Sequence, residues 1–212
     1  MSIAMPPSDT LASTTCDATP SGKDSSRVLI PPALLERAQW VLEVWTIVDG
    51  RPEASFVSPE TGRRADLKDP ATWASFEFAY EACRVSARPA QVAFVLTPED
   101  PFTAIVLHRC FDQVGDEIAP AAEIRMRLNS YSEMMICGQD MLILVEGKLP
   151  PMRRMQFSGI QGLRGVTIFE RNRAVVIMGQ RFSDTSPNVE PRQVELEALV
   201  AQLRPSGRPR RR

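Results

Sequence analysis

The sequence is poor in the residues that bind transition metals. It has a single histidine, His108, and its four cysteines, Cys16, Cys83, Cys110 and Cys137, are far apart, with no Cys-x-x-Cys pair. Structural zinc sites need several such ligands, usually in closely spaced pairs. The pattern therefore argues against a zinc finger or a zinc ribbon, and we expect the cysteines to be reduced, buried thiols.

Segments that would direct the chain to a membrane or cradle a nucleotide phosphate are also missing. No basic N-terminal region precedes an apolar run, and no window approaches the ~18 apolar residues of a membrane span. The patterns GxxxxGKS, GxxxxGKT, GxGxxG and GxSxG do not occur. We therefore expect a soluble, cytoplasmic protein without a membrane partner, and nothing supports a phosphate loop, a dinucleotide site or a hydrolase elbow.

Neither sign of charge is in excess. The 25 basic and 26 acidic residues leave a formal net charge of −1, so no bulk field draws the chain to nucleic acid. The basic residues are almost all arginine, however, and many lie in the C-terminal half. The arginines that could line a phosphate-binding surface are Arg153, Arg154, Arg164, Arg171, Arg173 and Arg181, joined by Arg208, Arg210, Arg211 and Arg212 of the C-terminal tail.

Two alternatives to a binding surface stay open. A scattered solvated surface and a GC-rich genome each explain an arginine bias without any ligand. Aromatic residues for base stacking are also few in this region, where only Phe157, Phe169 and Phe182 are available.

The composition predicts one domain with two arms. Residues 1–27 are rich in Ser, Thr, Pro, Ala and Asp and have no apolar periodicity, which predicts a disordered arm. Residues 204–212 contain five arginines, two prolines, a glycine and no acid, which predicts a basic disordered tail. The domain itself would span residues 28–203.

The centre of the predicted domain is the stretch Val92–Asp112. It contains two apolar runs, Val92–Thr97 and Phe102–Leu107, which we interpret as a hairpin in the middle of a sheet. The turn between them, Pro98–Pro101, carries Glu99 and Asp100, which we expect to be solvated. Polar residues follow the second strand, beginning with His108.

The remaining patterns complete an α+β fold with a mostly antiparallel sheet. Strands are predicted at Trp40–Val48 and Ala54–Val57, joined by a tight turn at Asp49-Gly50, at Met141–Val145, and as a pair at Gly165–Phe169 and Ala174–Met178. Helices are predicted at Ala33–Ala38, from Asp69-Pro70 onward, at Ala121–Leu128 and at Gln193–Leu203. The second helix would bury a stripe of Trp73, Phe76, Tyr80 and Cys83, and the third would have Arg125 and Arg127 facing solvent.

Several separated segments between Pro32 and Gly179 carry a family resemblance. They are the strand Trp40–Trp45, Thr61-Gly62, Asp69–Phe76, Ala93–Phe102, Cys110, Ser130–Glu133, Gly138 and Gly147–Pro150. In their order and spacing they resemble the N-terminal primase-polymerase domain of phage and plasmid replication proteins, of the archaeo-eukaryotic primase type. The resemblance implies an RRM-like sheet that bears two clustered acids, a histidine and a further acid.

The chain departs from that family pattern at the positions that would bind metal. The positions of the two clustered acids hold Val106 and His108, the position of the histidine holds Leu142, and the position of the last acid holds Thr167. Nucleotidyl transfer needs carboxylates that hold divalent metal ions. Val106 and Leu142 cannot ligate a metal, and Thr167 is a poor neutral ligand. These four positions are therefore expected to be vestigial, with no metal or other cofactor.

Three functional hypotheses follow. The first is a catalytically inactive primase-polymerase-like protein that binds single-stranded DNA or replication machinery as a plasmid or phage regulator or interference factor. The second is a protein-interaction module that inhibits a competing element's transfer or replication without binding DNA. The third is a diverged enzyme that uses His108 with Asp112 or Glu133. Cys110 beside His108 invites a nucleophile hypothesis, but two ordinary residues at a strand end are favoured. The oligomeric state stays open.

Overall fold

The computed structural model describes residues 29–150, 156–160 and 162–203, so the two predicted arms lie outside the described residues. The α+β class is confirmed. The helices are α1 (Pro32–Leu35), α2 (Phe76–Arg84), α3 (Ala119–Leu128) and α4 (Gln193–Leu203). The strands are β1 (Trp40–Val48), β2 (Arg51–Val57), β3 (Ala90–Leu96), β4 (Phe102–His108), β5 (Ser132–Met134), β6 (Met141–Glu146), β7 (Gln156–Ile160), β8 (Leu163–Phe169), β9 (Arg173–Val176) and β10 (Glu190–Pro191).

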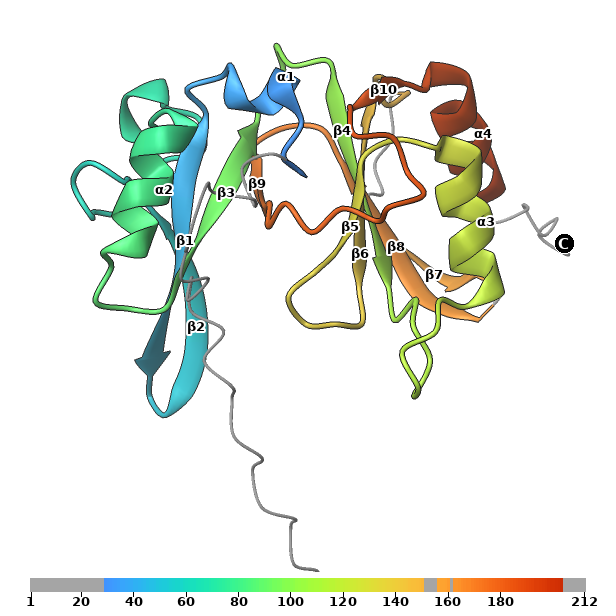
Figure 1. Ribbon diagram of the computed structural model, residues 1–212, viewed down its shortest axis with the longest axis horizontal. Helices are drawn as coiled ribbons and strands as arrows, with labels where there is room; N and C mark the ends of the chain where they lie inside the picture. Colours follow the sequence, from blue (N-terminus) through green and yellow to red (C-terminus); the bar gives the residue numbers. More distant parts are fainter. Residues whose placement is uncertain (1–28, 151–155, 161, 204–212) are drawn as a thin grey trace, which may run out of the picture.

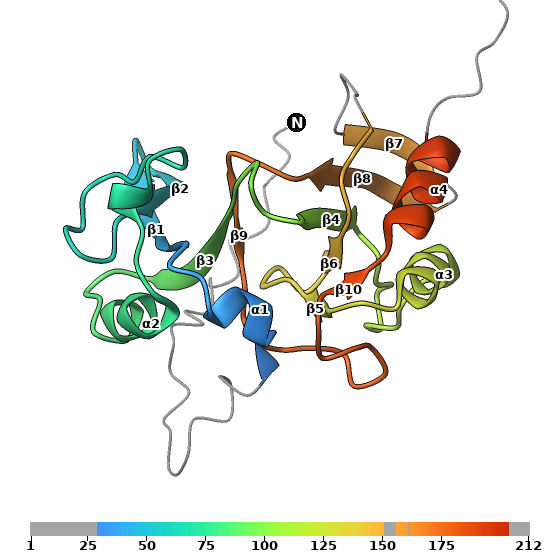
Figure 2. The same ribbon diagram turned by 90° about the horizontal axis from the view of Figure 1, so that it is seen from above.

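The described strands form two sheets rather than one. The first sheet has the order β2-β1-β3-β9, and the second has the order β10-β6-β4-β8-β7 with β5 paired to β6. All of these pairings are antiparallel except that of β10 with β6. In Figures 1 and 2 the first sheet lies on the α2 side of the molecule and the second on the α3 and α4 side.

The two strands that flank Pro98–Pro101 exist, but the hairpin prediction is wrong. β3 pairs with β1 and β9, whereas β4 pairs with β6 and β8. Both edges of each strand are therefore occupied, and the turn carries the chain from one sheet to the other. Asp100 is buried rather than solvated, because its carboxylate accepts hydrogen bonds from Arg37 (3.0 Å) and Gln39 (2.7 Å).

The predicted pairing of β8 with β9 is also wrong, for the same reason. β8 is hydrogen-bonded to β4 and β7 in the second sheet, whereas β9 crosses to the edge of the first sheet beside β3. The tight turn between β1 and β2 is confirmed. Asp49 and Gly50 both have positive φ, 49° and 73°, as a two-residue hairpin turn with primed geometry requires.

Each sheet buries its apolar faces in a different way. Trp40, Leu42 and Phe94 of the first sheet pack against Phe76 of α2, and the same core continues to Val106 of the second sheet. The face of the second sheet that does not carry Val106 packs against α3 and α4. The buried residues on this face include Ile105, Leu107, Ile143 and Ile168. The inner face of the second sheet, which carries Val106, is therefore turned toward the first sheet.

Two helix predictions need correction. The segment after Asp69 forms only a short 3-10 helix, Pro70–Thr72, and α2 begins later, with the Ser75 hydroxyl accepting from the Phe78 N–H. Trp73 therefore leaves the helical stripe and packs on the other face of the first sheet. Arg125 of α3 does not face solvent.

The burial of Arg125 has a clear cause in its surroundings. Its guanidinium donates to Glu117 (2.7 Å) and Asp184 (2.8 Å) and lies over the Phe182 ring. Arginine can be buried when its charge and donors are paired in this way, and periodicity alone cannot show such partners.

Candidate functional site

The structure brings the four expected site positions together on one face of the second sheet. Val106 on β4 lies directly opposite Thr167 on β8 and opposite Leu142 on β6. His108 lies two residues further along β4, so its side chain shares the face of Val106. Val106 and Leu142 are buried, whereas His108 and Thr167 are partly exposed. The polar end of this face therefore belongs to His108 and Thr167.

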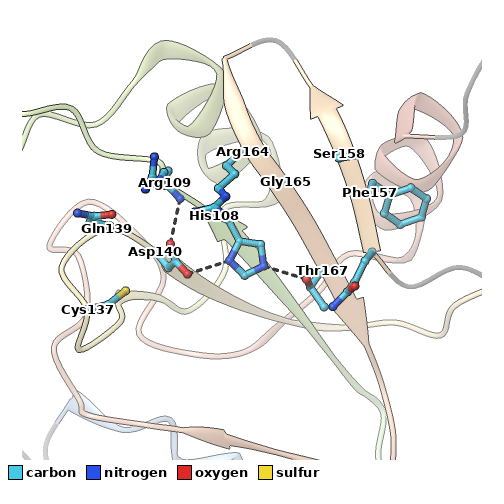
Figure 3. Close-up of a pocket in the computed structure, with 11 residues that line it drawn as sticks. His108, Arg109, Cys137, Gln139, Asp140, Phe157, Ser158, Arg164, Gly165 and Thr167 are labelled. Carbon is cyan, nitrogen blue, oxygen red and sulfur yellow. Dashed lines mark hydrogen bonds and ion pairs between the residues drawn. The ribbon is translucent and has the colours of Figure 1, made fainter. Parts of the chain in front are cut away.

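His108 is held between two side chains (Figure 3). Its Nδ1 lies 2.8 Å from Asp140 Oδ2, and its Nε2 lies 2.9 Å from Thr167 Oγ1. The other oxygen of Asp140 accepts the backbone N–H of Arg109 at 2.9 Å. Arg109 has φ of 52°, the left-handed conformation that turns the chain after β4 and directs this N–H at Asp140. The imidazole orientation is thus fixed from both sides.

The His108 ring forms part of the wall of an open pocket of about 670 Å³. Two cationic residues, Arg109 and Arg164, line this pocket, and both side chains are exposed. Neither guanidinium forms an ion pair with another residue in the described ranges. The guanidinium groups of Arg109 and Arg164 can therefore bind an anionic ligand without first losing an ion pair to another of the residues drawn in Figure 3.

A glycine lets β7 approach this pocket closely. A Cβ added to Gly165 would lie 2.7 Å from the Phe157 carbonyl oxygen on β7, nearer than such atoms can approach. Gly165 lies opposite His108 in the β4–β8 register. A side chain at this position would push β7 away from the pocket wall or enter the pocket itself.

A second pocket of about 400 Å³, which we name the sheet cleft, adjoins the first. It lies between β1 and β9 of the first sheet and β4 and β8 of the second, and it shares His108, Asp140 and Thr167 with the larger pocket. Its walls are largely apolar, formed by residues that include Met135, Ile136, Phe169, Val175, Val176 and Met178. Glu43, Trp45 and Glu133 also line it.

The glutamate carboxylates that line the sheet cleft already accept hydrogen bonds from neighbouring groups of the protein. Glu133 is buried and accepts the Tyr131 hydroxyl and the N–H groups of Met178 and Gly179, while Glu43 accepts the Trp45 indole N–H. No three His, Cys, Asp or Glu side chains among the described residues are grouped as a metal ion would require. Of the four positions that the resemblance singles out, Val106 and Leu142 have no donor atom, which leaves only the His108 imidazole and the Thr167 hydroxyl. These donors do not match the carboxylates that a pair of divalent metal ions requires.

The acids suggested as partners of His108 do not contact it. Asp112 accepts the backbone N–H groups of Val114 and Asp116 within its own turn, and Glu133 is satisfied by the bonds just described. The carboxylate that does contact His108 is Asp140, which the sequence reasoning missed. The strand register could have identified Asp140. Because Leu107 pairs with Met141 in antiparallel strands, the residue after Leu107, His108, lies beside the residue before Met141, Asp140.

Cys110 is a poor nucleophile in this setting. It is fully buried, its Sγ lies 3.4 Å from the Gln139 carbonyl oxygen, and burial, with a contribution from the Asp140 charge, raises the pKa of the thiol to about 12. Because the thiolate is the reactive form, Cys110 should be almost wholly unreactive at neutral pH.

We expect alkylation to separate the cysteines. Iodoacetamide should label the exposed Cys137 readily in the native protein, and Cys83 and Cys110 should react only after unfolding, because both are buried. Peptide mass spectrometry at increasing times measures this order, and the same reaction in denaturant is the control. Native labelling of Cys110 at the rate of Cys137 would contradict the described burial.

The candidate arginines do not form one described surface. Arg153, Arg154, Arg208, Arg210, Arg211 and Arg212 lie outside the described residues. Arg171 and Arg173 follow Phe169, the last residue of β8, whereas Gly165, which pairs with His108, lies near the first residue of that strand. The length of β8 therefore separates both arginines from the His108 pocket. Arg171 also pairs with Glu170 at 3.7 Å.

Sequence reasoning missed two exposed side chains beside the site. Arg109 was not among the candidate arginines, although its place directly after His108 at the end of a core strand was the available signal. Trp45 was not among the candidate stacking residues, because β1 is far from His108 in sequence and belongs to the other sheet, so that only the assembled fold places both residues in one pocket.

The fold and site together define an α+β protein with a cationic pocket on the inner face of an antiparallel sheet. No protein-family model matches the chain. The chain is similar to a DNA primase-polymerase of Nitratiruptor phage NrS-1, with 28% identity over 151 residues, which is 71% of this chain and 20% of that protein. This distant match supports the primase-polymerase-like resemblance, and the chain spans about a fifth of the relative's length.

No helix within the described residues is long and apolar enough to cross a membrane.

Proposed function

We propose that this chain is a primase-polymerase-like protein that binds single-stranded DNA without joining nucleotides, and that it acts as a regulator or interference factor in replication. The observation that carries this proposal is the donor set on the inner face of the second sheet. Val106, Leu142 and Thr167 share that face with His108, and a metal-binding pair of carboxylates is missing from these four positions.

Binding without metal follows from the same residues. In a metal-dependent transferase, divalent ions neutralise the phosphates. Here the pocket instead offers the guanidinium groups of Arg109 and Arg164, which suit phosphate oxygens by geometry and charge. The distant similarity to a phage DNA primase-polymerase favours nucleic acid over other polyanions.

The binding test compares wild type with an Arg109→Ala/Arg164→Ala double variant. We expect a labelled oligo-dT to bind wild type equally well in magnesium and in EDTA, because the cations are supplied by the protein. The double variant should bind about tenfold more weakly, and its slope of log affinity against log salt should fall by about 1.4, since about 0.7 is lost for each phosphate contact with a single strand. Fluorescence anisotropy across a salt series measures both.

The control is an Arg84→Ala/Arg88→Ala variant, which removes two exposed arginines outside both pockets and should bind as wild type. A primer-extension assay with magnesium or manganese tests the other half of the proposal. We expect no extension, and template-dependent extension that His108→Ala abolishes would overturn the non-catalytic assignment. Absence of DNA binding by wild type at low salt would overturn the binding role.

A further inference from the structure

Trp45 is a large aromatic side chain that the fold leaves exposed beside the candidate site. The chain has three tryptophans, and Trp40 and Trp73 are 0% and 9% exposed, whereas Trp45 is 40% exposed. Trp45 lies on β1, where its backbone N–H donates to the Pro89 carbonyl at 3.1 Å. The strand is therefore fixed at this point while its indole remains accessible.

The indole is oriented toward the sheet cleft. Its Nε1 donates to Glu43 Oε2 at 3.2 Å, and both residues share one face of β1 because they are two apart on a strand. Both line the cleft together with His108 and Thr167. Across β1 the neighbour of Trp45 is Ala54 of β2, whose small side chain leaves the ring uncovered.

The two pockets together match the two halves of a nucleotide unit. The larger pocket carries Arg109 and Arg164 and suits a phosphate, whereas the sheet cleft is mainly apolar and has Trp45 in its wall. They meet at His108, Asp140 and Thr167, so one ligand can occupy both. An unpaired base has a flat apolar face for stacking and is linked through its deoxyribose to a phosphate. A nucleotide unit therefore combines the two features that the two pockets require.

We propose that Trp45 is a stacking platform for an unpaired base of single-stranded DNA whose backbone phosphates lie against Arg109 and Arg164. This inference rests on the proposed function and adds a residue that contacts the base. Every base has a face that can stack on an aromatic ring, so Trp45 would strengthen binding with little selection of sequence. The carboxyl group of Glu43 holds the ring in place and is itself occupied by the indole N–H.

The test uses Trp45→Ala, the conservative Trp45→Phe and the matched control Ile47→Ala, which removes an apolar side chain 68% exposed on the same strand face. We expect Trp45→Ala to weaken oligo-dT binding about tenfold, Trp45→Phe to retain most of the affinity, and Ile47→Ala to bind as wild type. The salt slope of Trp45→Ala should stay at the wild-type value, because no phosphate contact is lost.

Two further measurements separate stacking from a general loss of binding. Oligo-dT should quench the tryptophan emission of wild type, and this quenching should largely disappear in Trp45→Phe, where only the buried Trp40 and Trp73 remain. An abasic oligonucleotide of the same length should bind wild type and Trp45→Ala equally. Wild-type affinity of Trp45→Ala for oligo-dT, or unchanged quenching in Trp45→Phe, would overturn this inference alone. A wild-type protein that binds no oligonucleotide would overturn the proposed function as well.

Discussion

Replacing Trp40 with alanine is expected to lower the free energy of unfolding by about 3–5 kcal/mol, the usual cost of deleting a fully buried large aromatic side chain. Trp40 has no exposed surface. Its ring meets Phe76 of α2 edge-on at 4.9 Å and Phe94 of β3 at 5.2 Å, and its Nε1 donates to the Leu34 carbonyl at 3.2 Å. Truncation would leave a cavity where α1, α2 and the first sheet meet.

Trp45→Ala is the matched control, since it removes the same side chain from the same strand. Because the Trp45 side chain is 40% exposed, whereas that of Trp40 is fully buried, we expect its loss to lower the unfolding free energy by much less, on the order of 1 kcal/mol. Urea titrations followed by circular dichroism measure both variants. If the two substitutions cost the same, the assignment of faces along β1 is incorrect.

Local patterns were sufficient for this strand but not for its surroundings. The run from Trp40 to Val48 predicts a strand, and Asp49-Gly50 predicts the turn that follows, because both depend on neighbouring residues only. Which strands pair depends on contacts distant in sequence. β3 and β4 were predicted to pair because they are adjacent in the chain, and no local feature shows that β1, β9, β6 and β8 already occupy their edges.

The site was partly accessible from the sequence for a similar reason. The resemblance pointed to Val106, His108, Leu142 and Thr167, and the register of β6, β4 and β8 brings these residues together. Asp140 lay outside the pattern because it occupies a loop position defined by that register alone. Trp45 and Arg109 lay outside it because exposure beside a pocket is a property of the assembled sheets.

Glu133 is the second residue whose replacement is expected to have a large effect. Its buried carboxyl accepts the Tyr131 hydroxyl at 2.6 Å and the N–H groups of Met178 and Gly179 at 2.9 Å each. Glu133→Ala would leave these donors without their acceptor, and each such loss in a buried place costs about 1–3 kcal/mol. We expect a total loss of about 3 kcal/mol or more, measured by urea unfolding.

Glu133→Gln tests the charge separately from the hydrogen bonds. Burial raises the pKa of the Glu133 carboxyl above its ordinary value of 4.5, despite the opposing hydrogen bonds. The folded protein therefore holds this proton more tightly than the unfolded chain does. The corresponding stability is fully present below the unfolded pKa and is lost as the pH rises through the folded value, by at most about 1.4 kcal/mol per pH unit.

The glutamine side chain does not ionise, so the variant lacks this loss. We therefore expect wild type to be the more stable protein near pH 4, and its advantage over Glu133→Gln to shrink as the pH is raised above the ordinary value of 4.5. Urea titrations of both proteins at several pH values measure the difference between their free energies of unfolding. The contributions of all other titratable groups are common to the two proteins and cancel in this difference. Parallel pH profiles would mean that Glu133 titrates alike in the folded and unfolded states, so that its hydrogen bonds fully offset its burial.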